Sequence, residues 1–235
     1  MNDTYPEQIT LPGQSSVADG PHDQSGMYVM HHAFRRDLAA FEAAVRATPI
    51  GDAATWRALG DRWTDFATVL HHHHGVEDEH LWPVLLAATT EDATGTALLH
   101  AMQAEHERID PSLTAVAAGF ATMVEHPCAD HRNALDVHVT ATRAALLAHL
   151  AHEETEALPL LQRTLSVEQN AAFEKAAQRA YPLRMIPFLL PWASDGLPDD
   201  VRRRIVESAG PAYGLLLRLL RGRYERAERR AFRYV

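Results

Sequence analysis

The feature that most constrains this chain is a histidine–glutamate pair that occurs twice with the same spacing. His73 precedes Glu77 by four residues, and His149 precedes Glu153 by four residues. A proline follows each glutamate by six residues, so the two segments superimpose with a constant offset of 76. Residues four apart on a helix share one face and lie about 6 Å apart along its axis. Each pair therefore predicts an imidazole and a carboxylate that converge on one point.

A single histidine precedes each of these pairs by a similar distance. His31 lies 42 residues before His73, and His106 lies 43 residues before His149. This repetition indicates a duplicated helical hairpin, and two such hairpins packed face to face would bring six donors together. Six donors are too many for one tetrahedral zinc ion. They suit two metal ions that share bridging carboxylates, and mixed imidazole and carboxylate donors suit iron, with manganese not excluded.

The rest of the sequence predicts an all-α chain, because alanine and leucine are abundant while β-branched and aromatic residues are thinly spread. Short connections between long helices favour an antiparallel up-down-up-down four-helix bundle. We expect a kink near Gly75, and a kink or break at Pro111 inside the third helix. The apolar spacing predicts the four helices at about residues 27–47, 54–85, 93–124 and 131–161.

The predicted organisation is a flexible leader over residues 1–25, the bundle over 26–163, and a C-terminal helical extension over 164–235. Ser166 and Gln169 have the spacing of a capping box, which opens a fifth helix. The proline-rich passage from Pro182 to Pro198 is expected to be extended. It would either form a lid over a pocket, cover the bundle surface, or contribute to a homodimer interface. Two further helices are expected after it.

Charge and composition restrict the partners. Residues 1–200 hold 12 Lys and Arg against 28 Asp and Glu, whereas residues 201–235 hold 10 Arg against three Glu. We interpret the basic tail as a solvated helix against an acidic body, and that body opposes nucleic-acid binding. No run of apolar residues is long enough for a membrane span, and no signal peptide is evident. The single cysteine, Cys128, fits a reducing compartment, so the cytoplasm is expected.

The histidines, the glutamates and their surroundings together resemble the hemerythrin-like proteins, also called HHE cation-binding domains, over about residues 27–163. The resemblance includes Met-His-His-Ala-Phe-Arg-Arg-Asp-Leu at 30–38 and Glu-Asp-Glu-His-Leu-Trp-Pro at 77–83. It implies a four-helix bundle around an oxo- or hydroxo-bridged di-iron centre that meets O2 and related small molecules. By this similarity Glu77 and Glu153 would bridge the irons, with four histidines as terminal ligands: His31, His73, His106 and His149.

The sequence departs from the oxygen-carrying hemerythrins at Asp110, where those proteins have a second histidine in the third helix. Their fourth-helix motif also ends in an aspartate five residues after its histidine, whereas Glu153 comes four after His149. Asp110 is either a carboxylate ligand or a residue with a capping or salt-bridging role. If a ligand is missing, an open iron position favours reaction with O2, peroxide or nitric oxide over reversible storage.

Several nearby residues have weaker claims. His32 competes with His31 for the first ligand position, and Tyr28 is a candidate second-sphere partner. The other members of the histidine run, His71, His72 and His74, are expected to face solvent.

Besides a protein that binds or reacts with O2, nitric oxide or peroxide, two functions remain open. They are a di-iron oxygenase or oxidase acting on a small organic substrate, and simple metal storage.

Overall fold

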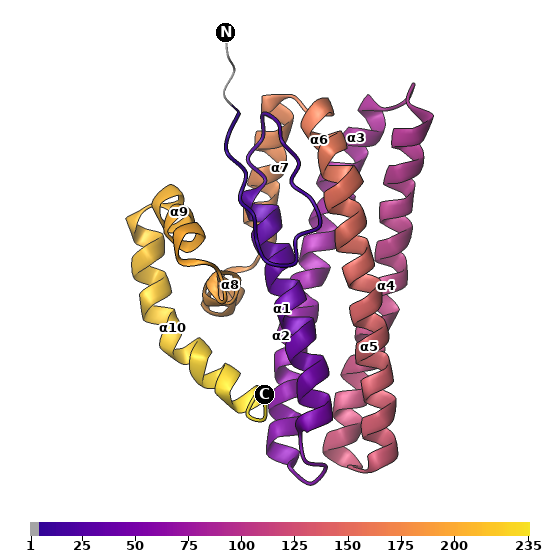
Figure 1. Cartoon of the computed structure of the whole chain (residues 1–235), viewed down its shortest axis with the longest axis vertical. Helices are drawn as coiled ribbons and strands as arrows, with labels where there is room; N and C mark the ends of the chain where they lie inside the picture. The colour runs from indigo at the N-terminus through magenta and orange to yellow at the C-terminus, as the bar shows by residue number, and fades with distance from the viewer. Residues whose placement is uncertain (1–4) are drawn as a thin grey trace.

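The computed structural model describes residues 5–235, and it contains helices but no β-strand among these residues. Four long helical rods lie side by side, and consecutive rods run in opposite directions (Figure 1). Two rods are single helices, and the other two are each built from three helical segments in succession. In chain order the rods are α1 (Ser25–Ala47), α2 (Ala53–Val76) with η1 (Glu77–Leu81) and α3 (Trp82–Ala88), α4 (Ala93–Glu125), and α5 (Ala129–His152) with η2 (Glu153–Ala157) and α6 (Leu158–Thr164).

The rods begin at side chains that bond free backbone N–H groups. Asp52 accepts from the Thr55 N–H at the start of α2, and Asp92 accepts from two N–H groups at the start of α4. The break or kink expected at Pro111 is not a break, because α4 continues through this residue. Pro111 cannot bond the carbonyl of Glu107, four residues earlier, but both residues are exposed and water can reach that carbonyl.

Two apolar clusters fill the space between the rods. One is rich in aromatic side chains and includes Phe34, Trp63 and Phe66, all fully buried. The other includes Leu81 and Trp82 near the opposite end of the bundle. The residues of the repeated histidine–glutamate motif lie in sequence between members of these two clusters. The bundle therefore contains a polar layer between two apolar cores.

The expected flexible leader is corrected from Tyr5 onward, while residues 1–4 lie outside the described part of the chain. Ile9, Leu11 and Ala18 are buried against the second apolar cluster. The side chain of Gln162 in α6 donates to the carbonyls of Ala18 and His22, both at 2.8 Å, and accepts from the His22 N–H at 3.0 Å. These bonds hold the leader against the bundle.

The C-terminal extension is more helical than expected. The capping box at Ser166 and Gln169 is present and opens α7 (Val167–Ala180). The expected extended passage instead contains η3 (Leu183–Met185) and α8 (Ile186–Ser194). A proline in the first turn of a helix loses no hydrogen bond, so Pro187 near the start of α8 suits that position. The chain ends with α9 (Asp199–Ala209) and α10 (Pro211–Ala231).

Buried polar contacts attach this extension to the side of the bundle formed by α1 and α2 (Figure 1). The indole Nε1 of Trp192 in α8 donates to Asp37 in α1 at 2.7 Å. Arg62 in α2 donates to Asp37 and to Glu228 in α10, both at 2.5 Å. One buried arginine thus connects the bundle with α10. None of the described helices combines the length and apolar character needed to cross a membrane.

Candidate metal centre

The polar layer of the bundle brings together all six residues expected to bind metal. They come from all four rods, and each is buried. The two oxygens of Glu77 face different histidines, with Oε1 at 3.2 Å from Nε2 of His73 and Oε2 at 3.5 Å from Nε2 of His106. Oε2 of Glu153 lies 3.2 Å from Nε2 of His31 and 3.8 Å from Nε2 of His149. Each glutamate therefore faces one histidine of its own hairpin and the single histidine of the other.

Both glutamates lie where the helix widens by one residue per turn. The Trp82 N–H bonds the Glu77 carbonyl, and the Leu158 N–H bonds the Glu153 carbonyl, five residues back in each case. The prolines of the repeated motif follow directly, and a proline cannot donate to the carbonyl four residues earlier. Such single π-turns recur at functional sites. The irregularity that we expected at Gly75 therefore begins two residues later, at Glu77.

His74 is a seventh member of the layer, and our expectation that it faces solvent is wrong. It is only 3% exposed, and its ring stacks on that of His106 with centroids 3.9 Å apart. Nitrogen atoms of His74, His106 and His149 lie within 4.8 Å of one another. A second group with the same spacing consists of His31, His73 and Glu153, and a third of Glu77, His149 and Glu153. The layer thus offers five imidazoles and two carboxylates.

Three of the histidines are oriented by carboxylates behind them. Nδ1 of His31 bonds Glu154 at 2.9 Å, Nδ1 of His106 bonds Asp78 at 3.0 Å, and Nδ1 of His149 bonds Glu105 at 2.9 Å. A carboxylate on Nδ1 holds the proton there and leaves Nε2 free as a donor to a metal. These three carboxylates had no spacing signal of their own in our sequence interpretation. Asp78 and Glu154 do, however, directly follow the two repeated glutamates.

Glu154 is itself held in place. Arg35 forms a bidentate contact with it, at 2.7 and 2.8 Å, and the backbone N–H of Ser15 donates to it at 2.7 Å. Burial would raise the pKa of Glu154, but these bonds and the one from His31 outweigh burial and lower it. The leader therefore reaches the metal layer through one carboxylate.

The two central glutamates differ in their electrostatic surroundings. Burial raises the pKa of Glu77 well above its ordinary value, and the charge of Glu153 adds to this rise. Burial also acts on Glu153, but His31 outweighs it and lowers the pKa to about 2. Burial lowers the pKa of His73 to about 3. Without a cation, the layer therefore favours one ionised and one neutral carboxyl group, and bound cations would stabilise both as carboxylates.

The hydrogen-bonding state of the layer fits a metal centre. Eight buried atoms of the layer have no hydrogen-bond partner among the described residues, although buried polar atoms are nearly always bonded; the six other such atoms of the described chain lie outside the layer. All eight belong to proposed donors, and together they could hold more than one cation. They are Nε2 of His31, Nε2 of His73, both ring nitrogens of His74, and both carboxylate oxygens of Glu77 and of Glu153.

The additional candidates make other contacts. The Asp110 side chain is exposed, and its Oδ2 lies 3.9 Å from Nδ1 of the exposed His71, so it does not reach the layer. His32 faces the carbonyls of Pro12 and Gly196 at 3.4 and 3.3 Å. The Tyr28 hydroxyl accepts from the Ala18 N–H at 2.8 Å, and burial raises the pKa of this phenol.

Two cavities of the described chain bear on the question of an organic substrate. One cavity lies between α8, α9 and α10, lined by residues that include Ser194 and Tyr224. Another lies where α4 passes η2 and α6, lined by residues that include Thr94 and Arg163. Neither is lined by a histidine or glutamate of the metal layer.

Comparison with known proteins gives a family and one distant relative. The family described as "Hemerythrin HHE cation binding domain" matches residues 23–161. The chain is also similar to "Zinc finger protein BRUTUS" of Arabidopsis thaliana, with 23% identity over 193 residues that make up 81% of this chain. The chain spans only 15% of the length of that protein. No solved structure matches the chain.

Proposed function

The chain belongs to the hemerythrin HHE cation-binding family, and we propose that its polar layer holds two iron ions that bind O2 or a related small molecule. Nitric oxide and peroxide are the related molecules that we include. The observation that supports this proposal best is the set of eight buried donor atoms without hydrogen-bond partners, shared between imidazoles and carboxylates. Mixed nitrogen and oxygen donors suit iron, and manganese would accept the same set.

We propose the following division of ligands. One metal position would use His31 and His73, and the other would use the group of three histidines that includes His74. Glu77 suits a bridging role because its two oxygens face histidines of different groups. Glu153 would be the second bridge. When bound, the iron pair would supply Lewis-acid and one-electron redox chemistry that the protein side chains lack.

The fifth imidazole, that of His74, favours reversible binding of a gas over irreversible reaction with it. Asp110 stands where the oxygen carriers have a histidine, and the sequence suggested either that Asp110 is a carboxylate ligand or that an iron position is left open. His74 instead supplies an imidazole from α2, so a ligand need not be missing. We therefore propose binding of a diatomic gas as the main function, with reaction toward peroxide second. The absence of a cluster residue from the lining of either described cavity gives no support to an organic substrate.

Metal analysis and optical spectroscopy test this proposal directly. The protein is reduced without air, its metal content is measured, and O2 is then added while the spectrum is recorded. We expect two irons per chain and a charge-transfer band that disappears when O2 is removed. Irreversible oxidation would instead indicate an oxidase or oxygenase. Failure to retain metal would contradict the proposal.

A further inference from the structure

The solvent side of α10 carries leucines and arginines on one face. Leu215 and Leu219 are 60% and 70% exposed, although leucine is usually buried. At 3.6 residues per turn, these positions continue along the same side of the helix to Arg223, Arg226 and Arg230, all exposed. We call these five residues the leucine–arginine face.

The arginines of this face have no ion-pair partner within the described chain. Arg223, Arg226 and Arg230 lie beyond 4.0 Å from every described carboxylate, whereas Arg221 and Arg229 on the neighbouring side pair with Glu225. The basic tail therefore rests on the acidic body through only a few of its arginines. Three unpaired guanidinium groups beside exposed leucines are suited to an acidic protein surface with an apolar centre.

On the buried side of the same helix lies the first of a series of neighbouring aromatic rings, which we call the aromatic column. Tyr224 lies between Arg223 and Arg226 in sequence but faces the bundle, and its ring is 6.1 Å from that of Phe188. Phe188 is 5.8 Å from Trp192, and Trp192 is 5.3 Å from Phe34. The column ends at His73, whose ring is 5.2 Å from Phe34. The rings join the helix with the leucine–arginine face to a proposed metal ligand.

We propose that the leucine–arginine face docks an acidic one-electron carrier protein and that the aromatic column is the electron route to the metal centre. This inference rests on the proposed di-iron function. In each docking event the carrier would lose one electron and one ferric ion would become ferrous. The aromatic rings serve as the packed medium and are neither oxidised nor reduced, and no covalent bond changes. A gas-binding centre needs such a donor whenever its irons become oxidised.

Charge favours this occupant over other anionic partners. Residues 1–200 carry 28 acidic against 12 basic residues, so an extended anionic surface such as a membrane or nucleic acid would be repelled by the body. A small acidic protein can meet α10 alone, because the helix lies on the outside of the molecule beyond α8 (Figure 1). Opposite charges also speed the encounter between the partners.

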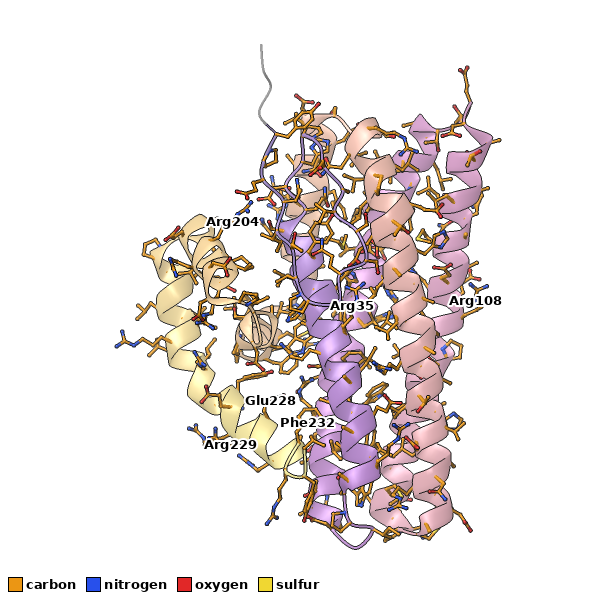
Figure 2. All side chains as sticks on the ribbon, in the orientation of Figure 1. Arg35, Arg108, Arg204, Glu228, Arg229 and Phe232 are labelled. Carbon is orange, nitrogen blue, oxygen red and sulfur yellow. The ribbon has the colours of Figure 1, made fainter. Side chains whose placement is uncertain are left out.

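A binding experiment on the metal-free protein tests the docking face without using the metal. The probe is oxidised plant-type ferredoxin, an acidic iron–sulfur carrier, and its dissociation constant is measured at low and high salt. We expect the triple variant R223E/R226E/R230E to bind on the order of tenfold or more weakly, because like charges replace attractive ones. The matched control is R108E, since Arg108 is 72% exposed but lies on α4, far from α10 (Figure 2). Equal binding by both variants would overturn the inference.

Reduction kinetics of the iron-loaded protein test the route. Phe188→Leu should slow reduction by ferredoxin at least severalfold without weakening binding, whereas reduction by dithionite, which needs no docking face, should be unchanged. Phe232→Leu is the control, because Phe232 packs on Phe41 outside the column. If dithionite also fails to reduce the metal, the proposed function fails. If ferredoxin reduces the Phe188→Leu and Phe232→Leu variants equally fast, only the route fails. Binding of anionic vesicles or self-association through the face, without ferredoxin binding, would overturn the docking proposal.

Discussion

Glu154 accepts a hydrogen bond from Nδ1 of His31 at 2.9 Å, although the two residues belong to opposite hairpins and lie 123 positions apart. The equivalent contact in the other direction joins Asp78 to His106 at 3.0 Å. Asp78 and Glu154 are separated by the same 76 positions as the repeated glutamates that precede them. Each hairpin therefore orients the single histidine of the other. Neither hairpin alone would complete the arrangement.

Glu154 and Asp78 each orient a histidine of the other hairpin, and the loss of each should weaken metal binding to a different extent. We predict that Glu154→Gln weakens iron affinity by roughly 10–100-fold, the usual effect of losing the hydrogen-bond partner of a ligand. Asp78→Asn should have a smaller effect, because Asp78 is partly exposed and has no contact like that between Glu154 and Arg35. Competition against a chelator measures both affinities. A larger loss for Asp78→Asn would contradict this ranking.

His74 should be required for full metal loading. We predict that His74→Ala lowers the bound iron from about two toward about one per chain and alters the charge-transfer spectrum, because a buried imidazole donor is lost. His71→Ala is the matched control, since His71 lies in the same histidine run but is largely exposed. Metal analysis after desalting distinguishes the two variants. Normal iron content and an unchanged spectrum in His74→Ala would exclude ligation by this residue.

The contrast between His73 and His74 shows how far the sequence could locate the site. Spacing of four residues correctly placed His73 and Glu77 on one face, because that rule describes convergence on a single point. A centre for two metals contacts a larger part of the helix circumference than a single metal does. The residue next to a ligand can therefore also face inward, and His74 does so. The sequence did contain a sign of this, because the two histidines are adjacent. If only one face of the helix is assumed to bind metal, however, one of them is interpreted as a donor and the other as a surface residue.

Contacts between segments far apart in the sequence could not be predicted, for a different reason. Trp192 and Asp37 are 155 positions apart, and no spacing rule connects an isolated tryptophan with an isolated aspartate. The prolines around Trp192 indicated extended chain, but Pro187 fits near the start of α8 and Pro191 is tolerated within it. The helices of the bundle were predictable because their apolar periodicity is local. The leader and the extension depend on tertiary packing.

The leader should be released by a single change in α6. Gln162→Ala removes the three hydrogen bonds that join this side chain to Ala18 and His22. We predict faster proteolytic cleavage within residues 12–20, because the backbone there would lose its attachment to the bundle. Limited proteolysis followed by mass spectrometry locates the cuts. Gln178→Ala, on the exposed surface of α7, serves as control, and equal cleavage of the two variants would contradict this role of Gln162.

Asp37 should contribute strongly to stability. Asp37→Asn keeps an acceptor for Trp192 but removes the charge between Arg36 and Arg62. Leaving a buried charge without its partner costs about 3–5 kcal/mol, and we expect the lower part of this range because Glu228 still pairs with Arg62. Urea unfolding followed by circular dichroism measures the loss. A change below about 0.5 kcal/mol, typical of surface substitutions, would show that the pair is not stabilising.

The pH dependence of unfolding should separate Asp37 from Glu228. Burial acts to raise the pKa of Asp37, but Arg62 and Arg36 outweigh it and lower the pKa below the unfolded value. Its stabilisation is thus complete above about pH 4 and disappears as the pH falls through the lowered pKa. Burial raises the pKa of Glu228, so its contribution is present at low pH and is lost as the pH rises.

We therefore predict that Asp37→Asn flattens the fall in unfolding free energy below about pH 4. Glu228→Gln should instead raise the unfolding free energy at neutral pH relative to that at acid pH, compared with the unmodified protein. The reason is that folding no longer opposes ionisation at that position. Urea titrations at several pH values give both slopes. An acid slope in Asp37→Asn equal to that of the unmodified protein would mean that Asp37 has the same pKa in the folded and unfolded chain, which is incompatible with its burial between two arginines.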